Sequence, residues 1–123
     1  MHNVKARLVV LALASLYWNV TLAQDGPVSA KEIQDTWVGK ELIGTTASGS
    51  KTFLRLESDG NASVSAGSTN DTGRWRISEN GYCTTWKTIR AGQERCYTVT
   101  RMGSTFRVAN PDGTVGGFFN YIK

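Results

Sequence analysis

Short β-prone runs separated by turn signals fill the chain from about residue 38 to its end, and this repeat restricts the fold more than any other feature. The turns recur about every 8–12 residues, a spacing typical of all-β sandwiches and barrels. Several contain Asn-Gly or Asp-Gly, which tolerate the positive φ of tight turns. The intervening runs predict eight strands, near residues 38–46, 52–57, 62–66, 73–78, 82–88, 94–101, 105–109 and 114–122.

Hydrophobic and polar residues alternate along several of these runs. Leu54 and Leu56 fall on one face of their predicted strand, opposite Arg55. One buried and one solvated face per strand is the antiparallel pattern. Eight short strands joined by tight turns form a meander, which removes its exposed edges by closing. The sequence therefore predicts an all-β fold, a small antiparallel eight-stranded up-and-down barrel, with a two-sheet sandwich as the alternative.

The first 23 residues are typical of a cleavable signal peptide. Lys5 and Arg7 precede an apolar run of eleven residues, 8–18, and the small Ala23 precedes the expected cleavage point. A membrane-spanning helix needs roughly 20 apolar residues. We therefore expect a periplasmic or secreted protein with no transmembrane segment after cleavage.

The next residues predict one short helix. Ser29 and Glu32 have the spacing of a capping box, in which the serine caps the helix and the glutamate returns to the serine amide. The helix should run through about Thr36, after a flexible lead-in over 24–28. The expected organisation is thus a signal peptide at 1–23, a lead-in and short helix at 24–36, and the β-barrel domain at 37–123.

Loss of the signal peptide would change the chemistry of the chain. The single histidine, His2, lies within it, and without histidine the remainder cannot build a Ser-His-Asp unit. It also lacks the commonest transition-metal ligand. We therefore expect no enzymatic activity, no catalytic residues, no metal and no cofactor. Twelve of the 14 basic residues would remain beside 10 acidic ones, and so small an excess does not favour a nucleic-acid partner.

Two cysteines, Cys83 and Cys96, predict one disulfide in an exported protein. A loop of this size should stabilise the fold by about 3 kcal/mol. A two-residue turn at Ala91-Gly92 would place Cys83 opposite residue 100. Direct pairing of the cysteines needs a wider loop centred near Ile89 and Arg90, and a diagonal or bulged bridge is the alternative.

A set of spaced motifs carries a resemblance over roughly residues 37–117. The motifs are Gly73-Arg-Trp75-Arg-Ile77, Gly81-Tyr-Cys83-Thr-Thr-Trp86, Cys96-Tyr97-Thr-Val99, Gly103-Ser-Thr-Phe106 and Asp112-Gly113. In this pattern the chain resembles a group of small exported bacterial proteins of unknown function with a calycin-like (lipocalin-like) β-barrel. The resemblance implies export, the disulfide and the barrel. It brings no catalytic residue, because that group has no established activity.

Two groups of side chains are candidate binding sites. Seven aromatic residues could fill the barrel or line a ligand cavity, since an eight-stranded barrel is just wide enough for either: Trp37, Trp75, Trp86, Tyr97, Phe106, Phe119 and Tyr121. Five basic residues share the outward parity of their strands and could form an anion-binding stripe or an ordinary solvated face: Arg55, Arg74, Arg76, Lys87 and Arg107.

The function expected from these features is a non-enzymatic binding module. It would engage a small apolar ligand at the barrel mouth, or another protein in the manner of an inhibitor. The alternative is an envelope protein that binds polyanions through the basic stripe, which would make binding strongly salt-dependent.

Overall fold

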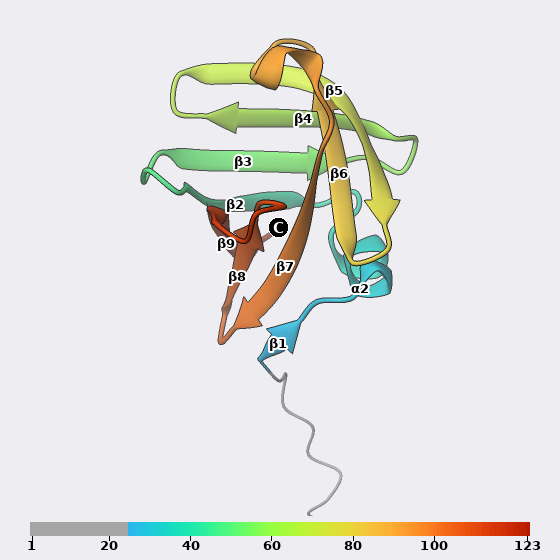
Figure 1. The fold of residues 1–123 in the computed structure, drawn as a ribbon, viewed down its shortest axis with the longest axis vertical. Helices are drawn as coiled ribbons and strands as arrows, with labels where there is room; N and C mark the ends of the chain where they lie inside the picture. The colour runs from blue at the N-terminus through green and yellow to red at the C-terminus, as the bar shows by residue number, and fades with distance from the viewer. Residues whose placement is uncertain (1–24) are drawn as a thin grey trace, which may run out of the picture.

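The computed structural model describes residues 25–123, so the predicted signal peptide lies outside the described residues. Figure 1 shows strands wound into a barrel, with one short helix at the lower right. The elements in chain order are β1 (Gly26–Pro27), α2 (Ala30–Thr36), β2 (Glu41–Thr46), β3 (Lys51–Leu56), β4 (Asn61–Ala66), β5 (Thr69–Ser78), β6 (Gly81–Trp86), the 3₁₀ turn η3 (Ile89–Gly92), β7 (Arg95–Met102), β8 (Thr105–Ala109) and β9 (Val115–Ile122).

Strands β2 to β9 form the predicted antiparallel up-and-down barrel. Each strand pairs with the next one along the chain, and β9 pairs back with β2 to close the ring. The closure excludes the two-sheet sandwich. One strand begins earlier than expected: the strand predicted at 73–78 extends back to Thr69, which pairs with Ala66 across a tight turn. Gly67 permits this turn with a φ of +61°.

The β2–β9 seam closes the barrel through a close approach and a bulge. A Cβ at Gly44 would lie 1.8 Å from the carbonyl oxygen of Phe118, so only glycine lets the strands meet there. Ile43 pairs with Tyr121 while Gly44 pairs with Phe119, which leaves one residue of β9 unpaired. The extra residue reverses the side-chain parity. Phe119 therefore points inward, whereas Tyr121 is 58% exposed.

The segment before the barrel is ordered against it, which differs from the flexible lead-in expected at residues 24–28. Gly26 and Pro27 form β1 and pair with β7 beyond the point where β6 leaves it. The amide of Val28 donates to the carbonyl of Val99 at 2.8 Å. Val28 is almost completely buried, so apolar contact adds to the backbone pairing.

Helix α2 begins at the predicted serine cap. The Oγ of Ser29 accepts a hydrogen bond from the amide of Glu32 at 3.1 Å. The second half of the capping box does not form, because the Glu32 carboxylate instead binds the guanidinium of Arg101 on β7. This ion pair attaches the helix to the barrel. Over residues 25–123, no helix has the length and apolar character that crossing a membrane requires.

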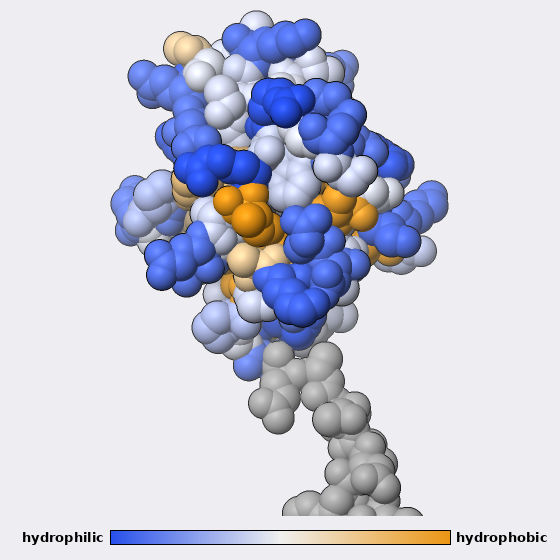
Figure 2. Space-filling view, turned by 90° about the vertical axis from the view of Figure 1, so that its right-hand side faces the viewer, coloured by the Kyte–Doolittle hydropathy of each residue, from blue (hydrophilic) through white to orange (hydrophobic). Residues whose placement is uncertain are grey.

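An aromatic cluster packs at the helix end of the barrel. Trp37 directly follows α2 and has no exposed surface. Its ring contacts the rings of Tyr82, Phe106 and Phe119, with centroids 5.5–5.8 Å apart. Such tilted and edge-on contacts stabilise an aromatic cluster beyond simple burial. The face in Figure 2 is mostly hydrophilic with small apolar patches, so the apolar side chains are concentrated inside.

Candidate ligand-binding site at the open end of the barrel

The barrel holds a cavity of about 190 Å³ at the end opposite α2. The last residues of β2, β4 and β6 and the first residues of β3, β7 and β9 surround this end. Most of the lining is apolar and comes from Leu54, Val64, Ala66, Trp86, Ile89, Val108 and Phe119. The polar lining includes Thr84, Tyr82, Tyr97 and Arg90. A concave apolar space with a few polar groups is the usual form of a small-molecule site.

The seven aromatic residues singled out from the sequence divide between the two ends of the barrel and its surface. Trp86, Tyr97 and Phe119 line the cavity. They share the core cluster with Trp37, and Trp75 and Phe106 are partly buried against it; these three do not line the cavity. Tyr121 does neither, because the β9 bulge turns it to solvent. The barrel is thus filled at one end and hollow at the other.

Two cavity residues that the sequence analysis missed come from β6. Tyr82 and Thr84 alternate with Cys83, so both side chains point into the barrel. The alternation of Tyr82, Thr84 and Trp86 was the available signal, but a threonine in a strand is usually unremarkable. Its hydroxyl is unusual here: Thr84 is 2% exposed and its Oγ1 has no hydrogen-bond partner among residues 25–123.

Tyr82 places a second hydroxyl group in the cavity wall. Burial raises the pKa of this hydroxyl far above its usual range, and the neighbouring Tyr97 raises it further, while Arg90 lowers it. The group therefore keeps its proton at neutral pH and can donate it in a hydrogen bond. The rings of Tyr82 and Tyr97 lie side by side, with centroids 5.3 Å apart.

The long loop between β6 and β7 covers part of the cavity mouth. Within it Arg90 and Ala91 have φ values of 55° and 53°, in the left-handed region that non-glycine residues avoid. Consecutive residues in this conformation persist only where the surroundings hold them. They turn the loop so that both Ile89 and Arg90 line the cavity. The Arg90 guanidinium lies 5.7 Å from the centroid of the Tyr97 ring.

Asp71 on β5 anchors this loop. Its Oδ2 accepts from the amide and hydroxyl of Thr88 and from the amide of Ile89, each at 2.9 Å. Its Oδ1 accepts from the amide of Thr72 at 2.8 Å. The hydrogen bond from Ile89 is the largest cause of a pKa for the Asp71 carboxyl well below its usual range, and those from Thr88 and Thr72 add to it.

Acid should loosen the loop by protonating Asp71. Because the pKa of Asp71 is lower in the folded state, its contribution is complete above about pH 4, the ordinary range of aspartate. It declines as the pH falls from there through the folded-state pKa. Asp71→Asn should therefore speed amide hydrogen exchange of Thr88 and Ile89 at pH 7 and flatten the acid dependence of stability. The matched control is Asp35→Asn on α2. If the stability of Asp71→Asn and that of the unchanged protein fell identically with pH, Asp71 would not anchor the loop.

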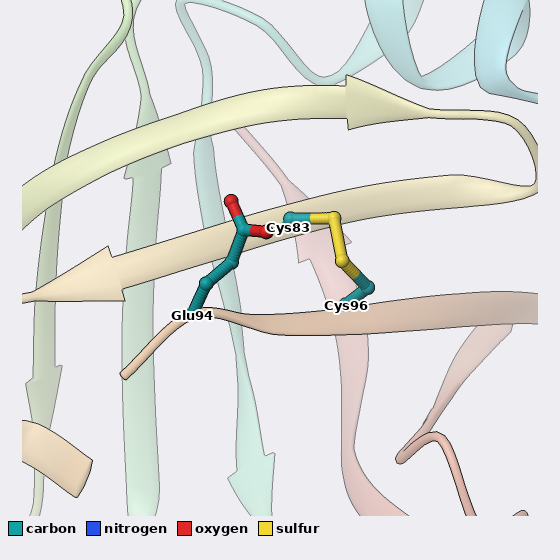
Figure 3. A group of neighbouring side chains, drawn as sticks. All are labelled: Cys83, Glu94 and Cys96. Carbon is teal, nitrogen blue, oxygen red and sulfur yellow. A yellow bond between two sulfur atoms is a disulfide. The ribbon is translucent and has the colours of Figure 1, made fainter. Parts of the chain in front are cut away.

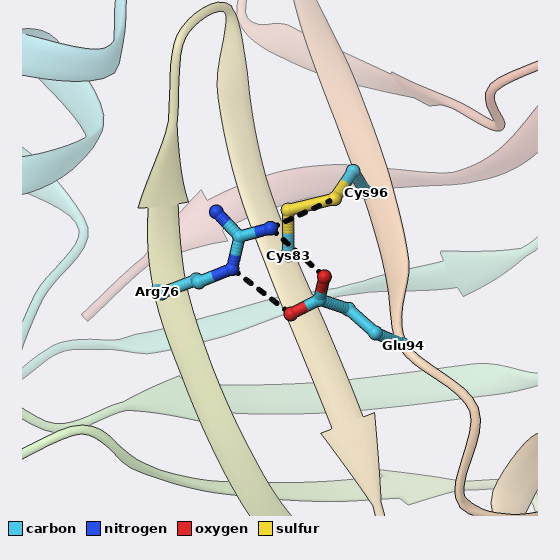
Figure 4. The surroundings of a disulfide bond; sticks show 4 residues. All are labelled: Arg76, Cys83, Glu94 and Cys96. Atoms are coloured by element: carbon cyan, nitrogen blue, oxygen red, sulfur yellow. Dashed lines mark hydrogen bonds and ion pairs between the residues drawn. A yellow bond between two sulfur atoms is a disulfide. The ribbon is translucent and has the colours of Figure 1, made fainter.

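The predicted disulfide joins directly paired residues on the outer face. Cys83 and Cys96 face one another across β6 and β7, so the wide loop is correct and the diagonal bridge is not. Figure 4 shows the guanidinium of Arg76 bound to both carboxylate oxygens of Glu94, at 2.8 and 2.9 Å, with one nitrogen 3.9 Å from the Cys96 sulfur. These contacts hold the pKa of Glu94 below its usual range.

The two cysteines and Glu94 also form the one close group of metal-ligating atoms among the described residues. Their sulfur and carboxylate atoms lie within 4.8 Å of one another. Figure 3 shows the three side chains together. Metals bind cysteine as the thiolate. Both sulfurs are used by the disulfide, and the carboxylate is bound to Arg76, so this donor set does not suit a metal ion.

Four of the five basic residues of the predicted stripe lie on three strands, and Lys87 directly follows β6. Arg74 and Lys87 border one shallow depression on the outer face, and Arg76 is two residues further along β5 than Arg74. Arg55 lies on β3 and Arg107 on β8. Each of the four arginines has a polar partner. Arg55 pairs with Glu57 and Arg76 with Glu94. Arg74 donates to Asn61, and Arg107 donates to the carbonyl of Gly113.

No protein family model, curated protein or solved structure matches this chain.

Proposed function

We propose that this chain is an exported, non-enzymatic binding protein that holds a small, largely apolar ligand in the open end of its barrel. The observation that carries the proposal is the cavity of about 190 Å³, lined by apolar side chains and by one buried hydroxyl without a partner. A buried polar group without a partner costs about 1–3 kcal/mol, and a bound molecule that pairs with it would offset that cost.

The size of the cavity sets the size of the ligand. An apolar cavity of roughly 150 Å³ binds benzene. A space of about 190 Å³ therefore accommodates one ring or a short aliphatic chain, with room for a small polar group. The polar groups of the wall would orient the ligand, while the apolar walls would provide most of the affinity.

Export is part of the proposal and rests on three features. Residues 1–23 have the pattern of a signal peptide, and the two cysteines form a disulfide, which persists in oxidising compartments. The motifs around Trp75, Cys83 and Cys96 also resemble small exported bacterial proteins with calycin-like barrels. A periplasmic or secreted location fits all three.

Blocking the cavity should abolish binding of a ring-sized probe. Benzyl alcohol should shift the amide resonances of Thr84, Ile89 and Tyr97, with a dissociation constant of about 1 mM, as expected for so few atoms. Ala66→Phe places a ring at the cavity mouth and should weaken binding by at least about tenfold, because it excludes the probe. NMR titration of the purified, disulfide-bonded protein measures the dissociation constant of the unchanged protein and of the Ala66→Phe variant.

The neighbouring residue provides a matched control. Ser65 lies on the same strand but lines a depression on the outer face, so Ser65→Phe adds the same ring outside the barrel. It should leave binding unchanged. The proposal fails if benzyl alcohol causes no shifts at cavity residues, or if the two phenylalanine variants bind it equally well while both remain folded.

A further inference from the structure

The polar groups that face the cavity share one property: they can donate hydrogen bonds. Arg90 is a permanent cation and only donates. The hydroxyl of Tyr82 is protonated at neutral pH, as an ordinary tyrosine hydroxyl is, and burial raises its pKa further. The hydroxyl of Thr84 is buried in the wall with its Oγ1 free of any partner in residues 25–123. A ligand group that accepts hydrogen bonds and carries negative charge would complement the cation of Arg90.

The charge of the site is positive and is not neutralised within the cavity. The lining includes one arginine and no aspartate or glutamate. Within residues 25–123 the Arg90 guanidinium forms no ion pair and lies over the face of the Tyr97 ring. The carboxylate of Asp71 accepts four hydrogen bonds, three from Thr88 and Ile89 of the loop and one from the amide of Thr72 on β5.

The position of Arg90 is set by the loop. Its backbone holds the left-handed conformation, and Asp71 binds the two residues that precede it. A guanidinium at the rim of an apolar cavity interacts more strongly with an anion than one in free solution, since less water competes. The loop thus presents a fixed cation to whatever enters the barrel.

From this arrangement we infer that the ligand is a small carboxylate, with one ring or short aliphatic chain inside the cavity and its carboxylate oxygens at Arg90. This inference rests on the proposed function. Guanidinium groups bind carboxylates through two parallel hydrogen bonds, which gives both strength and orientation. Tyr82 and Thr84 also line the cavity, and their hydroxyls are able to donate as well.

Benzoate and benzyl alcohol separate this inference from the proposed function, because they have the same ring and differ in charge. NMR titration or calorimetry should show benzoate binding about tenfold more tightly than benzyl alcohol. Arg90→Gln should remove that advantage, weakening the binding of benzoate about tenfold and that of benzyl alcohol less than twofold.

Arg74→Gln, which removes the same charge from the outer face, is the matched control and should change the affinity for neither probe. Thr84→Val, which keeps the side-chain shape, should weaken benzoate without lowering the melting temperature.

Each outcome decides one of the two claims. Equal binding of benzoate and benzyl alcohol, or benzoate binding unaffected by Arg90→Gln, overturns the carboxylate inference and leaves the binding function in place. Failure of both probes to bind overturns the proposed function as well. Tighter binding of benzylamine than of benzoate also overturns the inference, since a cation should be repelled by Arg90.

Discussion

Replacing Trp37 with alanine should lower the free energy of unfolding by about 3–5 kcal/mol, a large part of the 5–15 kcal/mol typical of a small domain. Trp37 has no exposed surface and contacts three other aromatic rings. Its removal would leave a cavity at the junction of α2 and the barrel, where these strands cannot collapse without breaking their pairing. Urea denaturation followed by circular dichroism measures the change.

Two further variants test whether packing is the cause. Trp37→Phe should cost much less, because it keeps most of the ring contacts and removes an indole Nε1 that has no hydrogen-bond partner among the described residues. Tyr121→Ala removes an aromatic ring that is 58% exposed and should change stability by less than about 0.5 kcal/mol. If Trp37→Ala and Tyr121→Ala lowered the free energy of unfolding by similar amounts, this would contradict the buried position of Trp37.

Removing the disulfide should cost about 3 kcal/mol. Cys83 and Cys96 are 13 residues apart, and a loop of about this size loses that much conformational freedom in the unfolded state when it is closed. The double substitution Cys83→Ala/Cys96→Ala should therefore lower the melting temperature on the order of 10–20 °C. Differential scanning calorimetry at neutral pH measures the shift.

The β6–β7 seam should open first in that variant. Only four residue pairs join β6 to β7, against six between β5 and β6, and the disulfide is one of the four. Hydrogen exchange should therefore accelerate more in residues 95–98 than in β3, the control strand. The same pattern should follow reduction of the unchanged protein by dithiothreitol. Uniform acceleration in both regions would show that the bridge does not hold this seam in particular.

Local pattern was sufficient to predict the fold class. Period-two alternation and turn residues are properties of neighbouring amino acids, so the eight strands, the serine cap at Ser29 and the disulfide could be predicted before any tertiary contact was known. The errors also have local causes. The strand predicted at 73–78 was too short, because Gly67 and Ser68 alone complete the turn before it.

Features that depend on distant residues could not be predicted in this way. The Glu32 carboxylate binds Arg101, which is 69 residues away, instead of completing the capping box. Tyr121 points outward because β9 gains a bulge when it meets β2. The division of the aromatic residues between a filled end and a hollow end follows from where α2 docks, which no spacing within the strands reveals.

The sequence by itself determined that this protein has one small antiparallel barrel with a cross-link, since strand, turn and cysteine patterns are short-range properties. Only the tertiary structure decided that the barrel has a cavity, and that Thr84 and Arg90 face it. The physical reason is closure. A cavity exists only when eight strands meet around it, and the conformation that brings Arg90 to its rim depends on Asp71, which lies 17 residues before Thr88 on a neighbouring strand.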